Sequence, residues 1–518
     1  MRSKSLFNIP EKAFVTIGLI FGILFLLITP PFQAADELNH YYRSFQISSG
    51  QIIAEKQQNE VGGFLPKNLV TTTQKVSAGI PFNPEAKQNP EIIFSLLNVP
   101  LESNNKVFIA FPNTAVYSPI PYLPQIIGIT LGKTINLTPI LIMYVGRVCN
   151  LLVWLVLGYF AIKVIPICKW TFFLLALTPM SLFQAASLSA DAVTNGVSFL
   201  LIATFLQLAL EPRLPDWNQK VEEINSTSQK YLDKKIFIIF LLSVLLALSK
   251  QAYFPLVGLF LLIPVEKIGN RKKYIGIFAL LCLASVLAIL SWSLISKGTY
   301  TTLVPNVAPS KQIQFILTHP FDLIGVILRT FFKDGVEYIS QFIGKLGWMD
   351  TKLPPLFILS YLVILVFSVN TGVVQNRDVN VTHRQAKGGF WKSRRKDAQA
   401  ASRRVDTKVI TEDDLSVSGL TYKDILISTR QKRILLLILI LNVILIATIL
   451  YISWTPVAKD RVFGLQGRYF IPIAPIFFLL LYKDKFKLKI RNINMIIVLY
   501  SVLSGTLTAV VLLKRYYL

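Results

Sequence analysis

The sequence predicts an all-α membrane protein with about eleven transmembrane helices and a large first extracytoplasmic loop. Of its 518 residues, 53% are hydrophobic and 16% are charged, whereas roughly 25% of the residues in a soluble domain are charged. Many apolar stretches approach the roughly 20 residues that a helix needs to cross a bilayer. Lysine and arginine gather between these stretches, as they do in cytoplasmic loops. We therefore expect one integral membrane domain over residues 1–518, surrounded by a lipid bilayer.

The formal net charge of +25 does not indicate a nucleic-acid partner, because the basic residues follow the loops rather than forming one patch. Anionic lipid head groups and phosphorylated lipids are the more natural partners of such loops. The three cysteines and three histidines are far apart and show no metal-ligand spacing. A topology signal without any ligand is the alternative, and it accounts for most of the positive charge.

The first third of the chain begins with a basic segment, which places the N-terminus in the cytoplasm. A first span over residues 13–30 then leads to an extracytoplasmic loop over residues 31–116, whose early part has a helical pattern. Prolines interrupt residues 117–135, which indicates an interfacial or re-entrant element. Further spans are expected over residues 139–161, 170–187 and 191–210.

The rest of the chain continues this alternation. Basic residues flank both ends of the apolar stretch 236–266, so we expect a hairpin whose outer tip carries Lys250. Residues 371–433 are basic and poor in aromatic residues, as in a flexible cytoplasmic loop, and residues 297–353 are expected outside with an amphipathic piece. The remaining predicted spans cover residues 274–296, 354–370, 434–453, 471–482 and 493–513, which leaves the C-terminus outside.

The stretch from Pro30 to Arg43 stands out, because charged residues follow directly on the first span. Two prolines end the apolar run, and a helix that restarts near Ala35 places Asp36, His40 and Arg43 at i, i+4 and i+7, on one face. Such residues at a membrane surface are costly unless they are paired or functional. The alternative is a salt-bridged cap on the first span.

The predicted topology brings further polar residues to the outer side of the membrane, where acids and bases together suggest an anionic substrate and acid–base chemistry. Each has a structural alternative: Arg147 could extend to the interface, Asp191 could cap a helix, and Lys250 could lie in a solvated turn. Arginine and tyrosine also serve as interfacial anchors. The residues gathered on this side are Asp36, Glu37, His40, Arg43, Arg147, Asp191, Lys250, Asp350, Arg461, Arg468 and Tyr469.

The spaced motifs of this chain resemble those of a family of bacterial membrane proteins grouped as domain of unknown function 2142. They are Pro-Pro-Phe-Gln-x-x-Asp-Glu-x-x-His-x-x-Arg from Pro30 to Arg43, Ser-Leu-Ser-Ala-Asp-x-x-x-Asn from Ser187 to Asn195, and Gly-Leu-Gln-Gly-Arg-Tyr-Phe-x-Pro from Gly464 to Pro472. Residues 371–433 look like an insertion. The family is similar to the glycosyltransferase C (GT-C) superfold, whose members have many spans and a large first outer loop.

The resemblance implies a multi-pass protein of the bacterial plasma membrane that takes a polyprenyl-phosphate-linked sugar as donor. It places Asp36 or Glu37 at the position of the acidic residue that follows span one in GT-C enzymes. A sugar hydroxyl needs a carboxylate that takes its proton or holds a metal, so a divalent cation stays open as a cofactor. The phosphate leaving group needs cations, and we expect the substrate to be bound by His40, Arg43, Arg147, Asp191, Lys250, Arg461, Arg468 and Tyr469.

We therefore expect an integral-membrane glycosyltransferase that acts on a cell-envelope glycan or lipid at the outer face. Asp36 is the first candidate for the catalytic base or metal ligand, and Glu37 is the second. Two alternatives belong to other classes of protein: a transporter or flippase of lipid-linked saccharides, and a non-catalytic scaffold for envelope synthesis. A transporter typically has pseudo-symmetric halves with paired broken helices, and the sequence has no evident internal repeat.

Overall fold

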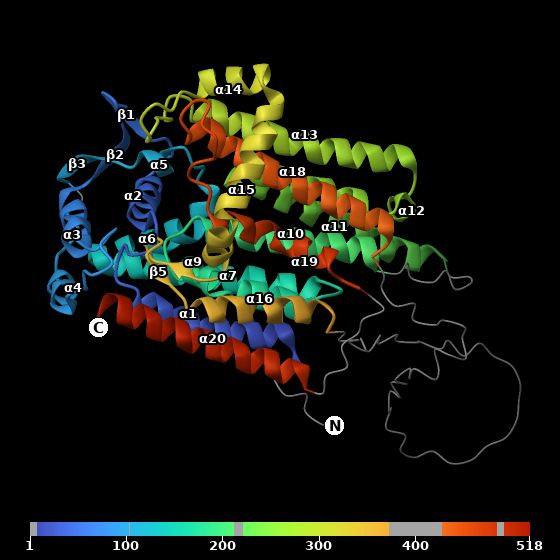
Figure 1. The fold of residues 1–518 in the computed structure, drawn as a ribbon, viewed down its shortest axis with the longest axis horizontal. Helices are drawn as coiled ribbons and strands as arrows, with labels where there is room; N and C mark the ends of the chain where they lie inside the picture. The colour runs from blue at the N-terminus through green and yellow to red at the C-terminus, as the bar shows by residue number, and fades with distance from the viewer. Residues whose placement is uncertain (1–7, 103, 212–220, 372–426, 484–491) are drawn as a thin grey trace, which may run out of the picture.

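A computed structural model describes residues 8–102, 104–211, 221–371, 427–483 and 492–518, with the side chains of residues 221–228 left undescribed. Long helices run side by side in a bundle, and smaller elements from the first loop gather at one end of it (Figure 1). We call this the sheet end, because it carries a small β-sheet. Most of the loop expected over 371–433 lies outside the described residues.

Six helices are long and apolar enough to cross a membrane, or seven if a strongly bent pair, α14 and α15, counts as one span. The described chain is thus largely helical, as predicted. The six helices are α1 (Pro10–Ile28), α7 (Pro139–Val164), α10 (Asp191–Leu210), α13 (Arg271–Ile295), α18 (Thr429–Ser453) and α20 (Ile493–Tyr516). The other elements of the bundle are α8 (Lys169–Ala176), α9 (Pro179–Ala185), α11 (Val221–Ser249), η3 (Gln251–Leu262), α12 (Val265–Ile268), α16 (Pro355–Val369), η4 (Gly467–Ile473) and α19 (Ala474–Leu480).

The first loop folds into short helices and a three-stranded antiparallel sheet in the order β1-β2-β3. Gly62 pairs with Ala110 in this sheet, and a Cβ at Gly62 would lie 1.8 Å from the carbonyl oxygen of Ile109, so only glycine fits there. The elements are α2 (Glu37–Ser48), β1 (Glu55–Gln57), β2 (Glu60–Pro66), α3 (Lys67–Ser77), α4 (Pro90–Leu96), β3 (Lys106–Ala110), α5 (Pro112–Ala115), η2 (Ile120–Tyr122) and α6 (Leu123–Thr134).

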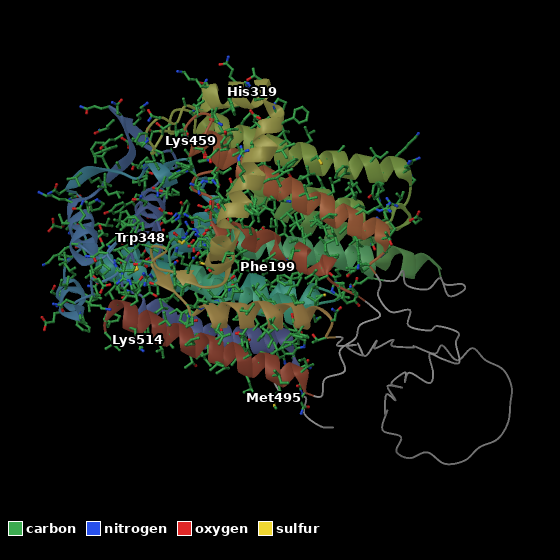
Figure 2. All side chains as sticks on the ribbon, in the orientation of Figure 1. Phe199, His319, Trp348, Lys459, Met495 and Lys514 are labelled. Carbon is green, nitrogen blue, oxygen red and sulfur yellow. The ribbon has the colours of Figure 1, made fainter. Side chains whose placement is uncertain are left out.

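Helix α10 forms the centre of the bundle, since 89% of its most apolar window is buried. It packs against α7, α11, η3 and η4, and its Phe199 contacts the rings of Trp154 and Phe172. Figure 2 shows Phe199 among the helices, whereas Met495 and Lys514 mark opposite ends of α20, which packs against α1. A helix that is apolar on every side is expected at such a central position.

Two predicted spans are interrupted near the sheet end. The span expected over 170–187 consists of α8 and α9, separated at Leu177-Thr178, where the Thr178 hydroxyl caps α9 by accepting from the N–H of Ser181. The hairpin predicted at Lys250 is present as a break between α11 and η3, a 3-10 helix. The second interruption places Lys250 at the candidate site described below, whereas Thr178 at the first is fully buried.

The segment expected outside the membrane, residues 297–353, contains α14 (Pro309–Thr318), α15 (Pro320–Ile343), and the strands β4 (Lys345–Leu346) and β5 (Thr351–Lys352). Helices α14 and α15 meet at an angle of 108°, and α15 runs across the bundle instead of along it (Figure 1). The predicted amphipathic piece is therefore a long helix that lies crosswise near the sheet end.

The C-terminal end of α20 joins the sheet end of the molecule. Arg515 pairs with Asp350 at 2.7 Å and donates to the carbonyl oxygens of Ala86 and Asn83 in the first loop. The start of α1 lies at the opposite end of the bundle (Figure 1). The two ends of the described chain thus lie at opposite ends of the bundle.

Candidate functional site

Asp36 lies where the chain leaves α1 and enters α2. Its backbone adopts the left-handed conformation, with φ at 62°, a strained geometry that concentrates at functional sites in non-glycine residues. Its side chain is 37% exposed. One carboxylate oxygen accepts a hydrogen bond of 2.9 Å from Asn113, and the other accepts one of 3.2 Å from Arg468. Asp36 is therefore held from two sides and remains open to a ligand.

Arg468 reaches Asp36 from a turn of the chain far along the sequence, in η4. Its side chain is 8% exposed, and its Nε lies 3.9 Å from a carboxylate oxygen of Asp191. That Nε has no hydrogen-bond partner among the described residues. The turn is fixed by Gly467, whose N–H donates to Gln341 of α15 at 2.7 Å. Arg468 is thus a nearly buried cation held between the carboxylates of Asp36 and Asp191.

Asp191 and Lys250 form a second ion pair beside the first, at 3.1 Å. Gln184 also donates to Asp191 at 2.9 Å, and Asp191 makes no side-chain cap of α10, so the capping alternative does not describe this residue. The ammonium of Lys250 lies 4.4 Å from the ring centre of Tyr469, a cation–π contact. Lys250 is not in a solvated turn, because its side chain is only 19% exposed.

His40 completes the group from α2. Its Nδ1 forms a hydrogen bond of 2.8 Å with the hydroxyl of Tyr122. Burial lowers the pKa of His40 from 6.5 to about 4, and the charges of Asp36 and Asp191 oppose this shift only in part. The imidazole is therefore neutral at pH 7 and is able to donate or accept one hydrogen bond at each nitrogen.

Glu37 and Arg147 lie apart from the open site and form a fully buried ion pair, with both side chains at 0% exposure. The Arg147 guanidinium donates to both carboxylate oxygens of Glu37, at 2.7 and 2.6 Å. Its other N–H groups donate to the carbonyl oxygens of Leu26, Thr29 and Pro30. All five donors of the guanidinium are used. Arg147 thus has no donor free for the phosphate contact that we expected.

The Pro-Pro sequence explains this pair. In a continued helix the carbonyl of Leu26 would accept from the N–H of residue 30, but Pro30 has none, so Arg147 supplies the donor. The Glu37 carboxylate also accepts from the N–H of Leu188, at 2.9 Å. Glu37 therefore ties the end of α1 and the start of α2 to the turn that precedes Asp191, and it does not face the open site.

The structure gives two further predicted ligand residues other partners. Arg43 is fully buried and donates to Gln46 and to the carbonyl oxygens of Ile52 and Tyr117, so it holds the first loop together. Arg461 pairs with Asp334 of α15 at 3.5 Å, away from Asp36. The predicted residues that do come together are Asp36, His40, Asp191, Lys250, Arg468 and Tyr469, which we call the charged cluster.

Sequence reasoning missed several residues that hold the charged cluster in place. Asn113, Gln184, Tyr122 and Gln341 are uncharged, and each lies in a segment without a conspicuous polar pattern. Their function is visible only from their partners. Gln184 carried the strongest signal, because a glutamine within a predicted apolar span is costly unless it is bonded.

A small pocket of about 10 Å³ adjoins the cluster at Arg468. One wall is polar, with Gln184, Ser187 and Ser189, and another carries the apolar side chains of Met180, Phe183 and Met349. The pocket is also lined by Ala34, Ala35 and Gly347. Polar and apolar side chains thus meet beside Arg468, in a space the size of a single water molecule.

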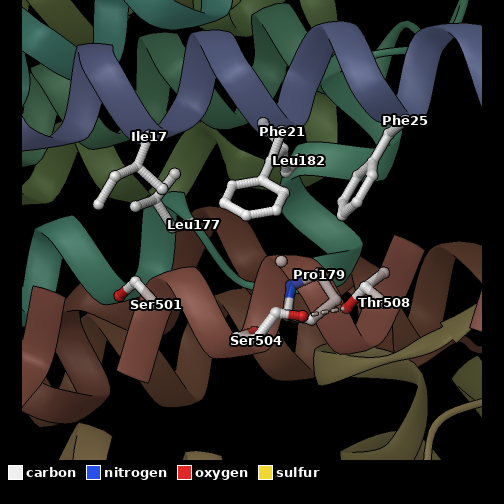
Figure 3. Close-up of a pocket in the computed structure, with 10 residues that line it drawn as sticks. Ile17, Phe21, Phe25, Leu177, Pro179, Leu182, Ser501, Ser504 and Thr508 are labelled. Carbon is white, nitrogen blue, oxygen red and sulfur yellow. Dashed lines mark hydrogen bonds between the residues drawn. The ribbon is translucent and has the colours of Figure 1, made fainter. Parts of the chain in front are cut away.

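A second cavity lies on the other side of α9, between α1 and α20. Figure 3 shows Phe21 and Phe25 of α1 facing Ser504 and Thr508 of α20, with Pro179 and Leu182 of α9 between them. The Thr508 hydroxyl donates to the carbonyl of Ser504 at 2.8 Å. Helix α9 thus separates a largely apolar cavity from the cavity that adjoins the charged cluster.

The described part of the chain has no group of three or more histidine, cysteine, aspartate or glutamate side chains placed to hold a metal ion. Asp36 and Asp191 are the carboxylates of the cluster, and both are compensated by Arg468 and Lys250. The arrangement is able to accept a proton at Asp36, which is exposed, and to bind an anionic group at the two cations.

Comparison with known proteins gives one result. The family described as "Predicted membrane protein (DUF2142)" matches residues 19–477, a range that includes every residue of the charged cluster. No curated protein and no solved structure matches the chain. The match covers most of the sequence and agrees with the family indicated by the three motifs. The chain therefore belongs to the DUF2142 family of membrane proteins.

Proposed function

We propose that this protein is a glycosyltransferase of the bacterial plasma membrane that transfers a sugar from a polyprenyl-phosphate donor to a cell-envelope glycan or lipid. The proposal depends mainly on one observation: the partly exposed carboxylate of Asp36 lies beside the nearly buried guanidinium of Arg468, 3.2 Å away. A base and a phosphate-binding cation are the two groups that this reaction needs most.

The chemistry assigns a step to each group. The Asp36 carboxylate accepts the proton of the acceptor hydroxyl while the hydroxyl oxygen bonds to the anomeric carbon of the donor sugar. The bond from that carbon to the phosphate oxygen breaks, and its electron pair leaves with the lipid phosphate. Arg468 and Lys250 compensate the charge that develops on the phosphate. His40, neutral at pH 7, is available to hydrogen-bond the sugar.

The surroundings of Arg468 support a lipid-linked donor. Apolar side chains, Met180 and Phe183, lie on one side of the small pocket beside Arg468, and the polar Gln184 lies on the other. The cluster also lies where α1 ends, at the level where a lipid tail and a water-borne acceptor are able to meet.

We also infer a GT-C-like arrangement with eleven passes. In addition to the six long helices, five segments would cross: α8 with α9, α11, η3, α16, and η4 with α19. Support comes from the two ends of the described chain, which lie at opposite ends of the bundle and so require an odd number of passes (Figure 1).

The main test replaces Asp36 by asparagine, which keeps the shape of the side chain and removes its charge. We expect transfer of labelled sugar from a polyprenyl phosphate to fall by about 10²- to 10⁴-fold, the usual contribution of a positioned base. Asp460→Asn is the matched control, because Asp460 pairs with the exposed Lys333 outside the cluster. Transfer at the parental rate by Asp36→Asn would refute the catalytic assignment.

A second pair of variants tests the phosphate contact. Arg468→Ala is expected to raise the apparent KM for the donor and to slow turnover, whereas Arg461→Ala, seven residues earlier, should leave both unchanged. The same assay with EDTA and with added magnesium decides whether a divalent cation takes part. Equal donor KM values for the two alanine variants would contradict the role of Arg468.

One observation favours a flippase of lipid-linked saccharides as the second candidate. The helices are interrupted at both partners of the Asp191–Lys250 pair, between α9 and α10 before Asp191 and between α11 and η3 at Lys250, and transporters place broken helices at their binding sites. Protein reconstituted in vesicles that moves a fluorescent lipid-linked saccharide across the membrane, without transferring its sugar, would establish this alternative instead.

A further inference from the structure

Helix α15 exposes a continuous apolar stripe along its length. At 100° per residue, positions 321, 328, 332 and 336 fall on one side of the helix. They are occupied by Phe321, Leu328, Phe332 and Val336, with exposures of 83%, 64%, 92% and 81%. Large apolar side chains so fully exposed in a row indicate a surface that is covered by something apolar.

The opposite side of α15 packs against the rest of the protein. Its Thr330 hydroxyl accepts from the N–H of Val462, and the side-chain Oε1 of its Gln341 accepts from the N–H of Gly467, directly before Arg468. A Cβ at Gly467 would lie 1.9 Å from the carbonyl oxygen of Tyr338, so helix and turn are in close contact. The buried face of α15 therefore positions the turn that carries Arg468.

Along one side of α15, charged residues lie between the exposed apolar stripe and the buried face. Arg329 donates to the carbonyl oxygen of Asp460, and Lys333 pairs with its carboxylate at 3.7 Å. On the helical wheel Arg329 and Lys333 lie between the apolar stripe and the buried face. Helix α15 thus has a buried face, an apolar exposed face and a polar strip, which is the pattern of a helix that lies in a membrane interface.

The position of α15 agrees with this pattern. It runs across the bundle near the sheet end (Figure 1), and α14, which precedes it, packs against α18 and exposes Leu317 at 76%. Helices α13 and α18 expose apolar side chains such as Leu294 and Leu441 along their lengths, as expected of lipid-facing surfaces. The stripe on α15 continues this lipid-facing surface around the end of the bundle.

We propose that α14 and α15 lie in the leaflet at the sheet end of the bundle, with the stripe from Phe321 to Val336 among the acyl chains. The polar strip faces the head groups and water. The helix then anchors the Arg468 turn at a fixed depth in the bilayer, because Gln341 and Tyr338 contact Gly467 from its buried face. The contact between the apolar stripe of α15 and the acyl chains does not depend on whether the charged cluster transfers sugar.

Spin labels on α15 test the proposal in lipid nanodiscs of phosphatidylcholine and phosphatidylglycerol. In a variant whose three cysteines are replaced by alanine, a label is attached through Phe332→Cys or Val336→Cys, and through Lys333→Cys as the matched control on the polar strip. Accessibility to oxygen, which concentrates in acyl chains, is compared with accessibility to a water-soluble nickel chelate.

We expect oxygen to relax the labels at 332 and 336 more strongly than the nickel complex, with the order reversed at 333. Strong nickel access at 332 and 336 would show an aqueous surface and overturn the proposal. Exclusion of both reagents at these two positions would mean that a second copy or a partner protein covers the stripe, which also overturns it. Because both residues are more than four-fifths exposed, the labels leave the packed core intact.

Discussion

Two neighbouring acids, Asp36 and Glu37, have opposite environments. Asp36 precedes α2 and has a left-handed backbone, whereas Glu37 is the first residue of the helix. Asp36 is 37% exposed and contacts Arg468, whereas Glu37 is fully buried against Arg147. The same Asp-Glu dipeptide thus supplies a reactive carboxylate and the buried ion pair that holds its backbone in place.

The buried pair should contribute mainly to stability. Glu37→Gln leaves the guanidinium of Arg147 uncompensated in a buried position, and removing one partner of such a pair costs about 3–5 kcal/mol. We expect a large drop in the thermal unfolding midpoint of the purified protein in detergent. Asp36→Asn should lower that midpoint far less, since its side chain has access to water. Similar losses for both variants would contradict this division of roles.

His40 predicts a specific pH dependence of stability. Its pKa is about 4 in the folded protein against 6.5 unfolded, so between these values the unfolded chain binds the extra proton and stability falls as the pH falls. His40→Gln removes this contribution, on the order of 3 kcal/mol across that window. Thermal unfolding measured from pH 7 to pH 4 checks this. His319→Gln, an exposed histidine, is the control and should keep the parental slope.

The sequence predicts the cluster residues better than it predicts their partners. Charge in or beside an apolar segment was a sufficient signal for Asp36, Asp191, Lys250 and Arg468. The same signal led us to expect a substrate contact for Arg147, which instead donates to the carbonyl oxygen of Leu26 at the end of α1. An arginine in either role has the same appearance in the sequence. Only the packing of distant segments distinguishes the two.

At the scale of elements, the crossing of α15 over the turn before Arg468 leaves no space at Gly467. Gly467→Ala would bring a Cβ within 1.9 Å of the backbone carbonyl of Tyr338, so the turn must shift and Arg468 with it. We expect binding of a polyprenyl-phosphate sugar to weaken by at least tenfold, measured by isothermal titration in detergent. Gly276→Ala is the control, because a Cβ there meets open space on α13. Unchanged binding by Gly467→Ala would contradict the positioning of Arg468 by α15.

Element boundaries follow from sequence where local chemistry decides them. Pro30 and Pro31 end α1, and the basic residues on both sides of 236–266 predicted the break at Lys250. The break between α8 and α9 was missed, although Pro179 directly follows Thr178 and cannot donate a hydrogen bond. Apolar composition hides such breaks, because it is the same in a continuous and an interrupted span.

For the whole molecule, the predicted orientation is open to direct measurement. A cysteine in place of the exposed Asn59 of the first loop should react with a membrane-impermeant maleimide added to intact cells. Cysteines in place of Lys272, at the start of α13, and within residues 371–433 should react only after the cells are lysed. These expectations follow from the distribution of basic residues. The reverse labelling pattern would show that the protein has the opposite orientation, with the charged cluster at the cytoplasmic face.

The helical membrane class of the protein and the approximate positions of its apolar helices were predictable, because apolar stretches and basic loops are local features of the sequence. The fold of the first loop was not. Its sheet joins β2 to β3 across more than thirty intervening residues, and its contact with Arg515 at the end of α20 depends on the complete chain. Lys514 and Arg515 argued mildly for a cytoplasmic C-terminus, yet Arg515 is paired with Asp350 at the sheet end.

The separation of the ion pairs along the chain sets an order for biosynthesis. Glu37 and Arg147 are 110 residues apart, so this pair is able to form as soon as α7 has entered the membrane. Asp36 and Arg468 are 432 residues apart. Asp36 and the Asp191–Lys250 pair therefore gain their contact with Arg468 only after most of the chain has been synthesised. A chain that is still being synthesised would therefore have the Glu37–Arg147 pair in place but would lack Arg468 in the charged cluster. Lipid-linked sugar would meet a competent site only after insertion of the late helices.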